Sequence, residues 1–197
     1  TTGQASGVRI SATPIYHPEF PTMSPDGLLD FWFAKDSERC WFDSTPAFDA
    51  QVRACFEDLW RQACVGQLAD WEDGPDGALA LVILLDQMPL NMFRDQPEGY
   101  STEALSREVA GRAIARGFDL RPGDMQKVFL YMPYMHSESL ADQDRAVELF
   151  VQAGLADNAR WAEHHREIIR RFGRFPHRNV ILGRNSTVAE LEWLASA

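Results

Sequence analysis

Histidines with carboxylates close by are the residues of this sequence best suited to acid–base chemistry. His136 lies two residues before Glu138 in "YMPYMHSESL", and His177 lies in "RRFGRFPHRN". An imidazole titrates near neutral pH, so a carboxylate that orients it can make it a general acid or base. We therefore take His136, Glu138 and His177 as candidate catalytic residues, with Glu138 or Asp86 as the orienting carboxylate.

Arginines surround His177. Between Arg160 and Arg184 the chain carries seven arginines and only two glutamates, within a protein of net charge −10. The planar guanidinium suits paired hydrogen bonds to a carboxylate or a phosphate. The cluster therefore fits either a pocket for an anion or a structural network with acidic segments. His165 lies on the apolar face of the helix expected before the cluster, which directs it toward the core or a cleft.

Polar residues also follow the most apolar segment of the chain, in "LLDQMPLNMFR". Asp86 and Gln87 end a nearly wholly apolar run, and Asn91 and Arg94 follow its proline. A carboxylate at the end of a buried helix is costly unless it is paired or hydrogen-bonded. These residues therefore either belong to a site or satisfy backbone groups and each other, with Asp86 paired to Arg94.

Together the three polar segments predict one polar cleft. Its expected ligand-binding residues are Asp86, Gln87, Asn91, Arg94, His136, Glu138, His165, Arg174, His177, Arg178 and Asn179. The first hypothesis is that the cleft binds a small anionic ligand or a peptide. The second is a hydrolase or lyase site with a His/carboxylate acid–base pair, and the third is a purely structural polar network in an interaction scaffold. No cofactor and no metal site is predicted, because nearby arginines raise the cost of adding a cation.

Composition restricts the other partners. The chain has 29 acidic and 19 basic residues, which disfavours binding to nucleic acid or to an anionic membrane. The longest apolar run, "ALALVILL", is too short to span a bilayer. Three cysteines without a CxxC pair fit buried thiols in a reducing compartment. We therefore expect a cytoplasmic protein, and no oligomeric state is predicted.

The chain after an N-terminal arm is expected to be helical. Residues 1–25 are rich in Thr, Ser, Gly and Pro, which predicts an extended or flexible arm, and residues 26–197 predict a single all-α domain. Apolar residues at helical spacing predict seven or eight helices in antiparallel pairs. They cover "LLDFWF", about residues 48–63, 78–88, 102–116, 124–132, 140–153 and 158–172, and a last helix opened by Thr187. Pro133 is expected to stop the helix that begins at residue 124, and Thr187 and Glu190 to form a capping box.

Several long strings resemble a known family. "LLDFWF", "LALVILLDQMPLNMFR", "FLYMPYMHSESLADQDRAVELF", "HREIIRRFGRFPHRN" and "ILGRNST" recur in that order in a bacterial family catalogued as domain of unknown function 924. The resemblance covers about Leu28 to Leu194 and implies a tetratricopeptide-repeat-like stack of helix pairs. It places the family's polar motif positions on Asp86, Gln87, Asn91, Arg94, His136, Ser137, Glu138, Gln143, His165, Arg174, His177, Arg178 and Asn179. It also implies an arginine where this chain has Leu90, so an anion pocket would lack one positive partner here.

Overall fold

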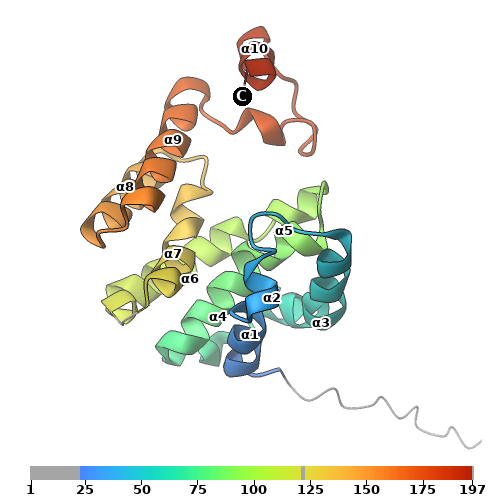
Figure 1. Ribbon diagram of the computed structural model, residues 1–197, viewed down its shortest axis with the longest axis vertical. Helices are drawn as coiled ribbons and strands as arrows, with labels where there is room; N and C mark the ends of the chain where they lie inside the picture. The colour runs from blue at the N-terminus through green and yellow to red at the C-terminus, as the bar shows by residue number, and fades with distance from the viewer. Residues whose placement is uncertain (1–22, 121–122, 197) are drawn as a thin grey trace, which may run out of the picture.

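The computed structural model describes residues 23–120 and 123–196, and these residues are helical without any strand (Figure 1). The α-helices are α1 (Pro25–Trp32), α2 (Lys35–Glu38), α3 (Pro46–Cys64), α4 (Pro75–Asp86), α5 (Met88–Met92), α6 (Glu103–Ala115), α7 (Asp124–Met135), α8 (Leu140–Gln152), α9 (Ala156–Phe172) and α10 (Val188–Ser196). Short 3-10 helices are η1 (Ala69–Asp73), η2 (Pro97–Tyr100), η3 (Phe118–Leu120) and η4 (Pro176–Arg178). Within the described residues, eight of these α-helices have eight residues or more, so the predicted all-α fold is confirmed. The expected N-terminal arm lies almost wholly outside the described residues.

Helix α4 forms the centre of the fold. Every residue from Gly77 to Asp86 is buried, and α4 packs against α1, α3, α6 and α7 (Figure 1). A helix that is apolar all round is stable only when other elements cover all its sides. Pro89 lies in the first turn of α5, where its missing N–H costs nothing, so a new helix begins there. The predicted central buried helix is confirmed, although it ends two residues earlier than expected.

Helix α3 turns a single apolar stripe toward this core. Phe48, Val52 and Phe56 are buried on it, as the helical spacing predicts. The expectation of buried thiols is wrong on the same helix. Cys55 and Cys64 are exposed and free, because both positions fall beside the buried stripe.

Helix α7 continues through the proline expected to end it. The helix extends to Met135, with Pro133 inside it and His136 as its C-terminal cap. Proline removes only its own N–H bond to the preceding turn, and the His136 N–H still bonds to the Met132 carbonyl at 2.9 Å. Burial of the turn on both sides of Pro133 keeps the chain helical, so His136 lies at a helix end directed into the molecule.

Neighbouring helices in the second half of the chain pack as successive pairs. Helix α6 contacts α7, α7 contacts α8, and α8 contacts α9, and Figure 1 shows α8 and α9 side by side. This arrangement is compatible with the tetratricopeptide-like stack that the resemblance implies.

The chain turns sharply after α9. Gly173 adopts a left-handed conformation with φ 70°, which glycine alone adopts without a steric cost. The following segment packs Phe175 against Ile168 and Ile169 in a small second core. Helix α10 then opens with the predicted capping box: the Glu190 N–H donates to Thr187 Oγ1 at 3.2 Å, and the Thr187 N–H donates to Glu190 Oε2 at 2.7 Å.

Candidate functional site

The ends of α4 and α7 bring a carboxylate and a histidine together. Asp86 is the last residue of α4 and His136 caps α7, and the two helices pack against each other. His136 Nδ1 lies 3.0 Å from Asp86 Oδ1 and 2.9 Å from Oδ2. Gln87 donates from Nε2 to Asp86 Oδ2 at 2.5 Å. The Asp86 side chain has no exposed surface, and these two partners offset the cost of burying its charge.

The pair sets the protonation of His136. Burial opposes a charge on the imidazole, but the negative charge of Asp86 and its hydrogen bond outweigh burial and raise the pKa of His136 above its usual 6.5. Nε2 has no hydrogen-bond partner among the described residues. It is also not one of the fully buried polar atoms that lack a partner, so its surface is partly exposed. Since Nδ1 and Nε2 lie on opposite edges of the ring, Nε2 points away from Asp86 and is accessible.

His136 borders a cavity of about 270 Å³, which we call the His136 cavity. Its walls are formed by Trp41, Phe42, Ser44, Gln87, Leu90, Asn91, Arg94, Met132 and His136. Trp41 is held rigidly: its Nε1 donates to the Trp32 carbonyl at 3.0 Å, and its ring meets the Phe129 ring edge-on at 4.8 Å. Phe42 is 71% exposed, so one wall of the cavity is an aromatic surface open to solvent.

Arg94 pairs with Asp49, which the sequence analysis missed. Arg94 Nε and Nη2 donate to Asp49 Oδ2 and Oδ1 at 2.5 and 3.0 Å, and Asn91 Nδ2 donates to Oδ1 at 2.8 Å. Burial raises the pKa of Asp49, but hydrogen bonds from Arg94, Asn91 and Ser44 lower it by more, so the net shift is downward. The alternative pairing of Arg94 with Asp86 is therefore wrong. Asp49 lies in the first turn of α3, where an acidic residue is expected for the helix dipole alone, so nothing in the sequence singled it out.

A second cavity adjoins the His136 cavity at this ion pair. It has a volume of about 390 Å³ and shares Ser44, Asn91 and Arg94 with the first cavity. Arg94 therefore lines both cavities, whereas Asp49 lines only the second.

Of the two carboxylates expected to orient His136, Glu138 does not take that role. Its carboxylate accepts two hydrogen bonds from Arg184, at 2.7 and 2.9 Å, and one from the Phe175 N–H at 2.8 Å. Burial raises the pKa of Glu138, and these hydrogen bonds more than offset it, so the pKa lies below its usual value. Arg184 in turn donates to Asn179 Oδ1 at 3.0 Å. Glu138 thus fixes the C-terminal segment to the turn before α8 and does not orient His136.

The Arg178 side chain is buried against two aromatic rings and a carboxylate. Its guanidinium lies between the rings of Tyr100 and Phe175, 4.7 and 4.6 Å from their centroids, and bonds to both carboxylate oxygens of Glu103 at 3.1 Å. Burial raises the pKa of Glu103, although Arg178 acts in the opposite direction. Arg178, Glu103 and Glu138 line a further cavity of about 360 Å³. Glu103 is another acidic residue in the first turn of a helix, and no sequence pattern distinguishes it from the others.

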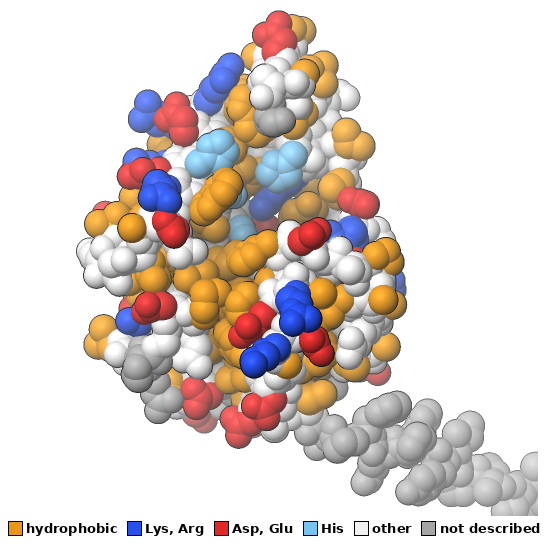
Figure 2. Space-filling view, viewed as in Figure 1, with side chains coloured by type: hydrophobic (Ala, Val, Ile, Leu, Met, Phe, Trp, Pro, Cys, Tyr) orange, Lys and Arg blue, Asp and Glu red, His pale blue; other side chains and the backbone are white. Residues whose placement is uncertain are grey.

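The other predicted residues lie in the C-terminal segment or in α9 before it. Arg174 binds Glu190 through two hydrogen bonds of 2.7 and 2.9 Å. His165 Nδ1 lies 2.8 Å from the Trp161 carbonyl, and burial lowers the pKa of His165 to about 4. The His177 side chain is exposed, yet desolvation by its neighbours and the charge of Arg178 still lower its pKa. Figure 2 shows histidines around a hollow on this face of the molecule.

The predicted single cleft is therefore divided. Gln87, Asn91, Arg94 and His136 line the His136 cavity with Asp86 behind them. Glu138, Arg174 and Asn179 form the hydrogen bonds that hold the C-terminal segment. Arg178 pairs with Glu103, His165 bonds within α9, and His177 is exposed. The two groups are close, because only Ser137 separates His136 from Glu138.

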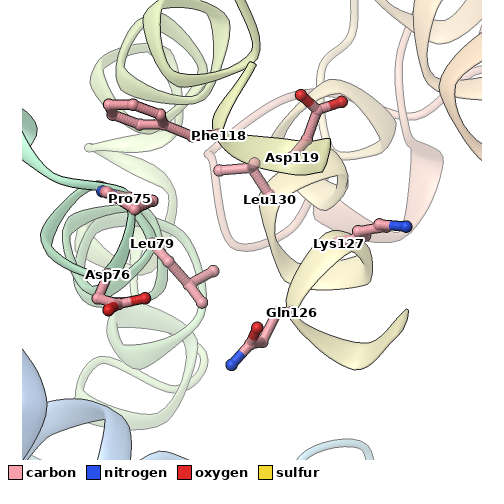
Figure 3. Close-up of a pocket in the computed structure, with 8 residues that line it drawn as sticks. All are labelled: Pro75, Asp76, Leu79, Phe118, Asp119, Gln126, Lys127 and Leu130. Atoms are coloured by element: carbon pink, nitrogen blue, oxygen red, sulfur yellow. The ribbon is translucent and has the colours of Figure 1, made fainter. Parts of the chain in front are cut away.

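A small cavity elsewhere is not a site for a ligand. It lies between α4 and α7 and has a volume of about 20 Å³ (Figure 3), which suffices for about one water molecule. Within residues 23–120 and 123–196, no group of three His, Cys, Asp or Glu side chains is placed to hold a metal ion. Nor does any helix in that part of the chain have the length and apolar character needed to cross a membrane.

Comparison with known proteins identifies the family. The family model described as "Bacterial protein of unknown function (DUF924)" matches residues 28–197. The chain belongs to the DUF924 family. It is also similar to a solved structure of a protein of unknown function from Agrobacterium tumefaciens, with 40% sequence identity and a TM-score of 0.83 over 88% of this chain and 97% of that one. No curated protein matches the sequence. The resemblance to DUF924 is thus confirmed, and Leu90, the position that departs from it, lies in the wall of the His136 cavity.

Proposed function

We propose that the protein is an acid–base enzyme, a hydrolase or a lyase, that binds a small molecule in the His136 cavity. One observation carries the proposal: His136 is held by a buried carboxylate at Nδ1, while Nε2 has no partner in the described chain and the ring borders an open cavity. A carboxylate at Nδ1 fixes the ring orientation and stabilises the imidazolium, so Nε2 can exchange a proton with a bound molecule.

The proposed roles follow from the contacts. Asp86 positions His136 and stabilises its protonated form, and Gln87 holds Asp86 in place through its 2.5 Å hydrogen bond. Because the pKa of His136 lies above 6.5, the neutral imidazole that can accept a proton forms as the pH rises through that pKa. A reaction in which His136 acts as the base therefore becomes faster with rising pH.

The test is a screen of purified protein against pools of esters, amides, phosphate esters and hydroxy acids. For any substrate turned over, His136→Gln should lower kcat/KM by about 10²- to 10⁴-fold. Asp86→Asn should lower it less and shift the rising limb of the pH profile to lower pH, since the negative charge that raises the His136 pKa is gone. His164→Gln is the matched control, because His164 is exposed on α9 and away from the cavity. Undiminished turnover in His136→Gln, or no turnover with any pool, would refute the proposal.

A second candidate is binding of an anionic ligand or peptide without catalysis, and Arg94 favours it. The guanidinium uses Nε and Nη2 for Asp49, whereas Nη1 has no partner among the described residues and the side chain is about half exposed. Arg94 can therefore hold a carboxylate at the boundary of the two cavities. Arg94→Met should weaken such a ligand about ten-fold or more, and an unchanged Kd would remove this candidate.

We also propose a small molecule as the partner and the cytoplasm as the location of the protein. The net charge of −10 supports a small molecule over nucleic acid or an anionic membrane. Three free cysteines, two of them exposed, support a reducing compartment such as the cytoplasm.

A further inference from the structure

The side-chain amides of Gln87 and Asn91 are oriented by the hydrogen bonds that their nitrogen atoms donate. Gln87 donates its amide N–H to Asp86, and Asn91 donates its amide N–H groups to Ser44 and Asp49. Carboxylates only accept hydrogen bonds, so both amide nitrogens must face them. Gln87 Oε1 and Asn91 Oδ1 are then directed away from these carboxylates.

These two oxygens are available to a ligand. Neither oxygen has a hydrogen-bond partner within residues 23–120 and 123–196. Neither belongs to the fully buried polar atoms that lack a partner. Solvent therefore reaches both oxygens, even though Gln87 and Asn91 are only 5% and 8% exposed. A rigid, nearly buried acceptor rewards a ligand that donates a hydrogen bond and penalises one that cannot.

His136 presents the complementary group. Because Nδ1 donates to the Asp86 carboxylate, Nε2–H donates a hydrogen bond whenever the ring is protonated, and Asp86 favours that form by raising the pKa of His136. Gln87 and Asn91, which carry these acceptors, line the cavity on the α4–α5 side, and His136 lines it at the end of α7. A group that donates and accepts at adjacent atoms fits both, as the N–H and C=O of an amide do.

The rest of the cavity is apolar. Trp41 is locked by its neighbours, Phe42 is largely exposed at its side, and Leu90 and Met132 complete the walls. Such walls bury an apolar or aromatic arm of a ligand.

We propose that the His136 cavity recognises a small secondary amide that carries an apolar arm: Gln87 or Asn91 accepts from its N–H, His136 donates to its carbonyl, and Trp41 and Phe42 flank the arm. This deepens the proposed function, because it names the class of molecule on which the Asp86–His136 pair would act.

Three probes of the same skeleton test the recognition. N-benzylacetamide has the N–H, benzyl acetate replaces it by oxygen, and N-benzyl-N-methylacetamide replaces it by a methyl group. Titration of the folded protein, followed by calorimetry or by NMR shifts of His136 and Gln87, should show N-benzylacetamide binding at least about five-fold more tightly than either analogue. Equal affinities, or no binding of N-benzylacetamide at 10 mM (about the weakest binding worth calling recognition), would overturn the inference.

Variants at the rim test the apolar arm. Phe42→Ala should weaken N-benzylacetamide about two- to ten-fold and leave N-methylacetamide, which has no arm, unaffected. Trp161→Ala is the matched control, because Trp161 is an aromatic residue 61% exposed on α9. An equal loss in both variants, or none in Phe42→Ala, contradicts the placement of the arm.

The two proposals fail in different ways. If the amide selectivity is found but no substrate is turned over, the acid–base function fails and the recognition stands. If His136-dependent turnover is found only for substrates without an N–H donor, the recognition fails and the acid–base function stands.

Discussion

Replacing Glu138 by Gln should loosen the C-terminal segment. The substitution keeps the size of the side chain but removes the charge that binds Arg184 twice and the Phe175 N–H once. Hydrogen bonds to charged groups contribute about 1.5–3 kcal/mol each in favourable settings. The side chains of Glu138 and Arg184 keep 28% and 23% of their surface exposed, so water screens the pair. We therefore expect a total loss of about 2 kcal/mol.

Thermal unfolding gives the first readout. For a domain of this size about 1 kcal/mol corresponds to a shift in Tm of about 2–4 °C, so Glu138→Gln should lower Tm by about 4–8 °C. Glu148→Gln is the matched control on α8, because its partner Arg145 lies 3.2 Å away and the side chains of Arg145 and Glu148 are 42% and 59% exposed. The control should change stability by less than about 0.5 kcal/mol.

Hydrogen exchange gives the second readout and locates the effect. Protection should fall in residues 175–196, which Glu138 and Arg184 hold, and not in α4. The pKa of Glu138 is lowered from 4.5 in the folded state. Its contribution is therefore complete above pH 4.5 and is lost as the pH falls through the folded pKa. A Tm within 1 °C of the wild-type value (about 0.5 kcal/mol or less), or loss of protection spread evenly over the chain, would refute this reasoning.

Gly77, His165 and Glu190 give further expected outcomes. A Cβ at Gly77 would lie 2.1 Å from the Trp71 carbonyl oxygen, whereas one at Gly74 meets nothing within 4 Å, so Gly77→Ala should cost about 2–3 kcal/mol in urea unfolding and Gly74→Ala under about 1 kcal/mol. His165 should titrate near pH 4 by NMR and not near 6.5. As the pH falls, the unfolded state binds a proton at this histidine before the folded state does. The contribution of neutral His165 to folding stability is therefore complete above pH 6.5 and is lost toward pH 4. Hydrogen bonds from Arg174 lower the pKa of Glu190 to about 2, so exchange protection of α10 should fall between pH 4.5 and 2, and Glu190→Gln should abolish that dependence.

Local sequence features predicted most of the fold. Helix ends followed from residues whose effect lies within one turn: the left-handed Gly173, and the capping box of Thr187 and Glu190. Pro133 misled the prediction because its effect on a helix depends on what covers the surrounding turn. The pattern of apolar residues showed that α4 is buried, but a pattern cannot show which helices cover it.

The sequence indicated side chains that the structure places around the His136 cavity, but not how they pair. The Asp86–His136 pair joins residues 50 positions apart, and the sequence offered Glu138 as an equally good partner for the histidine. Asp49, Glu103 and Arg184 were missed because each is an ordinary residue at its own position. Their importance comes from side chains that packing brings to them from distant segments.

The Asp86–His136 pair has a consequence for the core as a whole. Its two members end different helices, α4 and α7, and both helices are largely buried. The distance between carboxylate and imidazole is therefore set by how these helices lie against each other, and a shift of a few tenths of an ångström alters the proton affinity of the ring. The titration of a single histidine then reports on packing several turns away, and a substitution in the interior can disturb the chemistry while the protein stays folded.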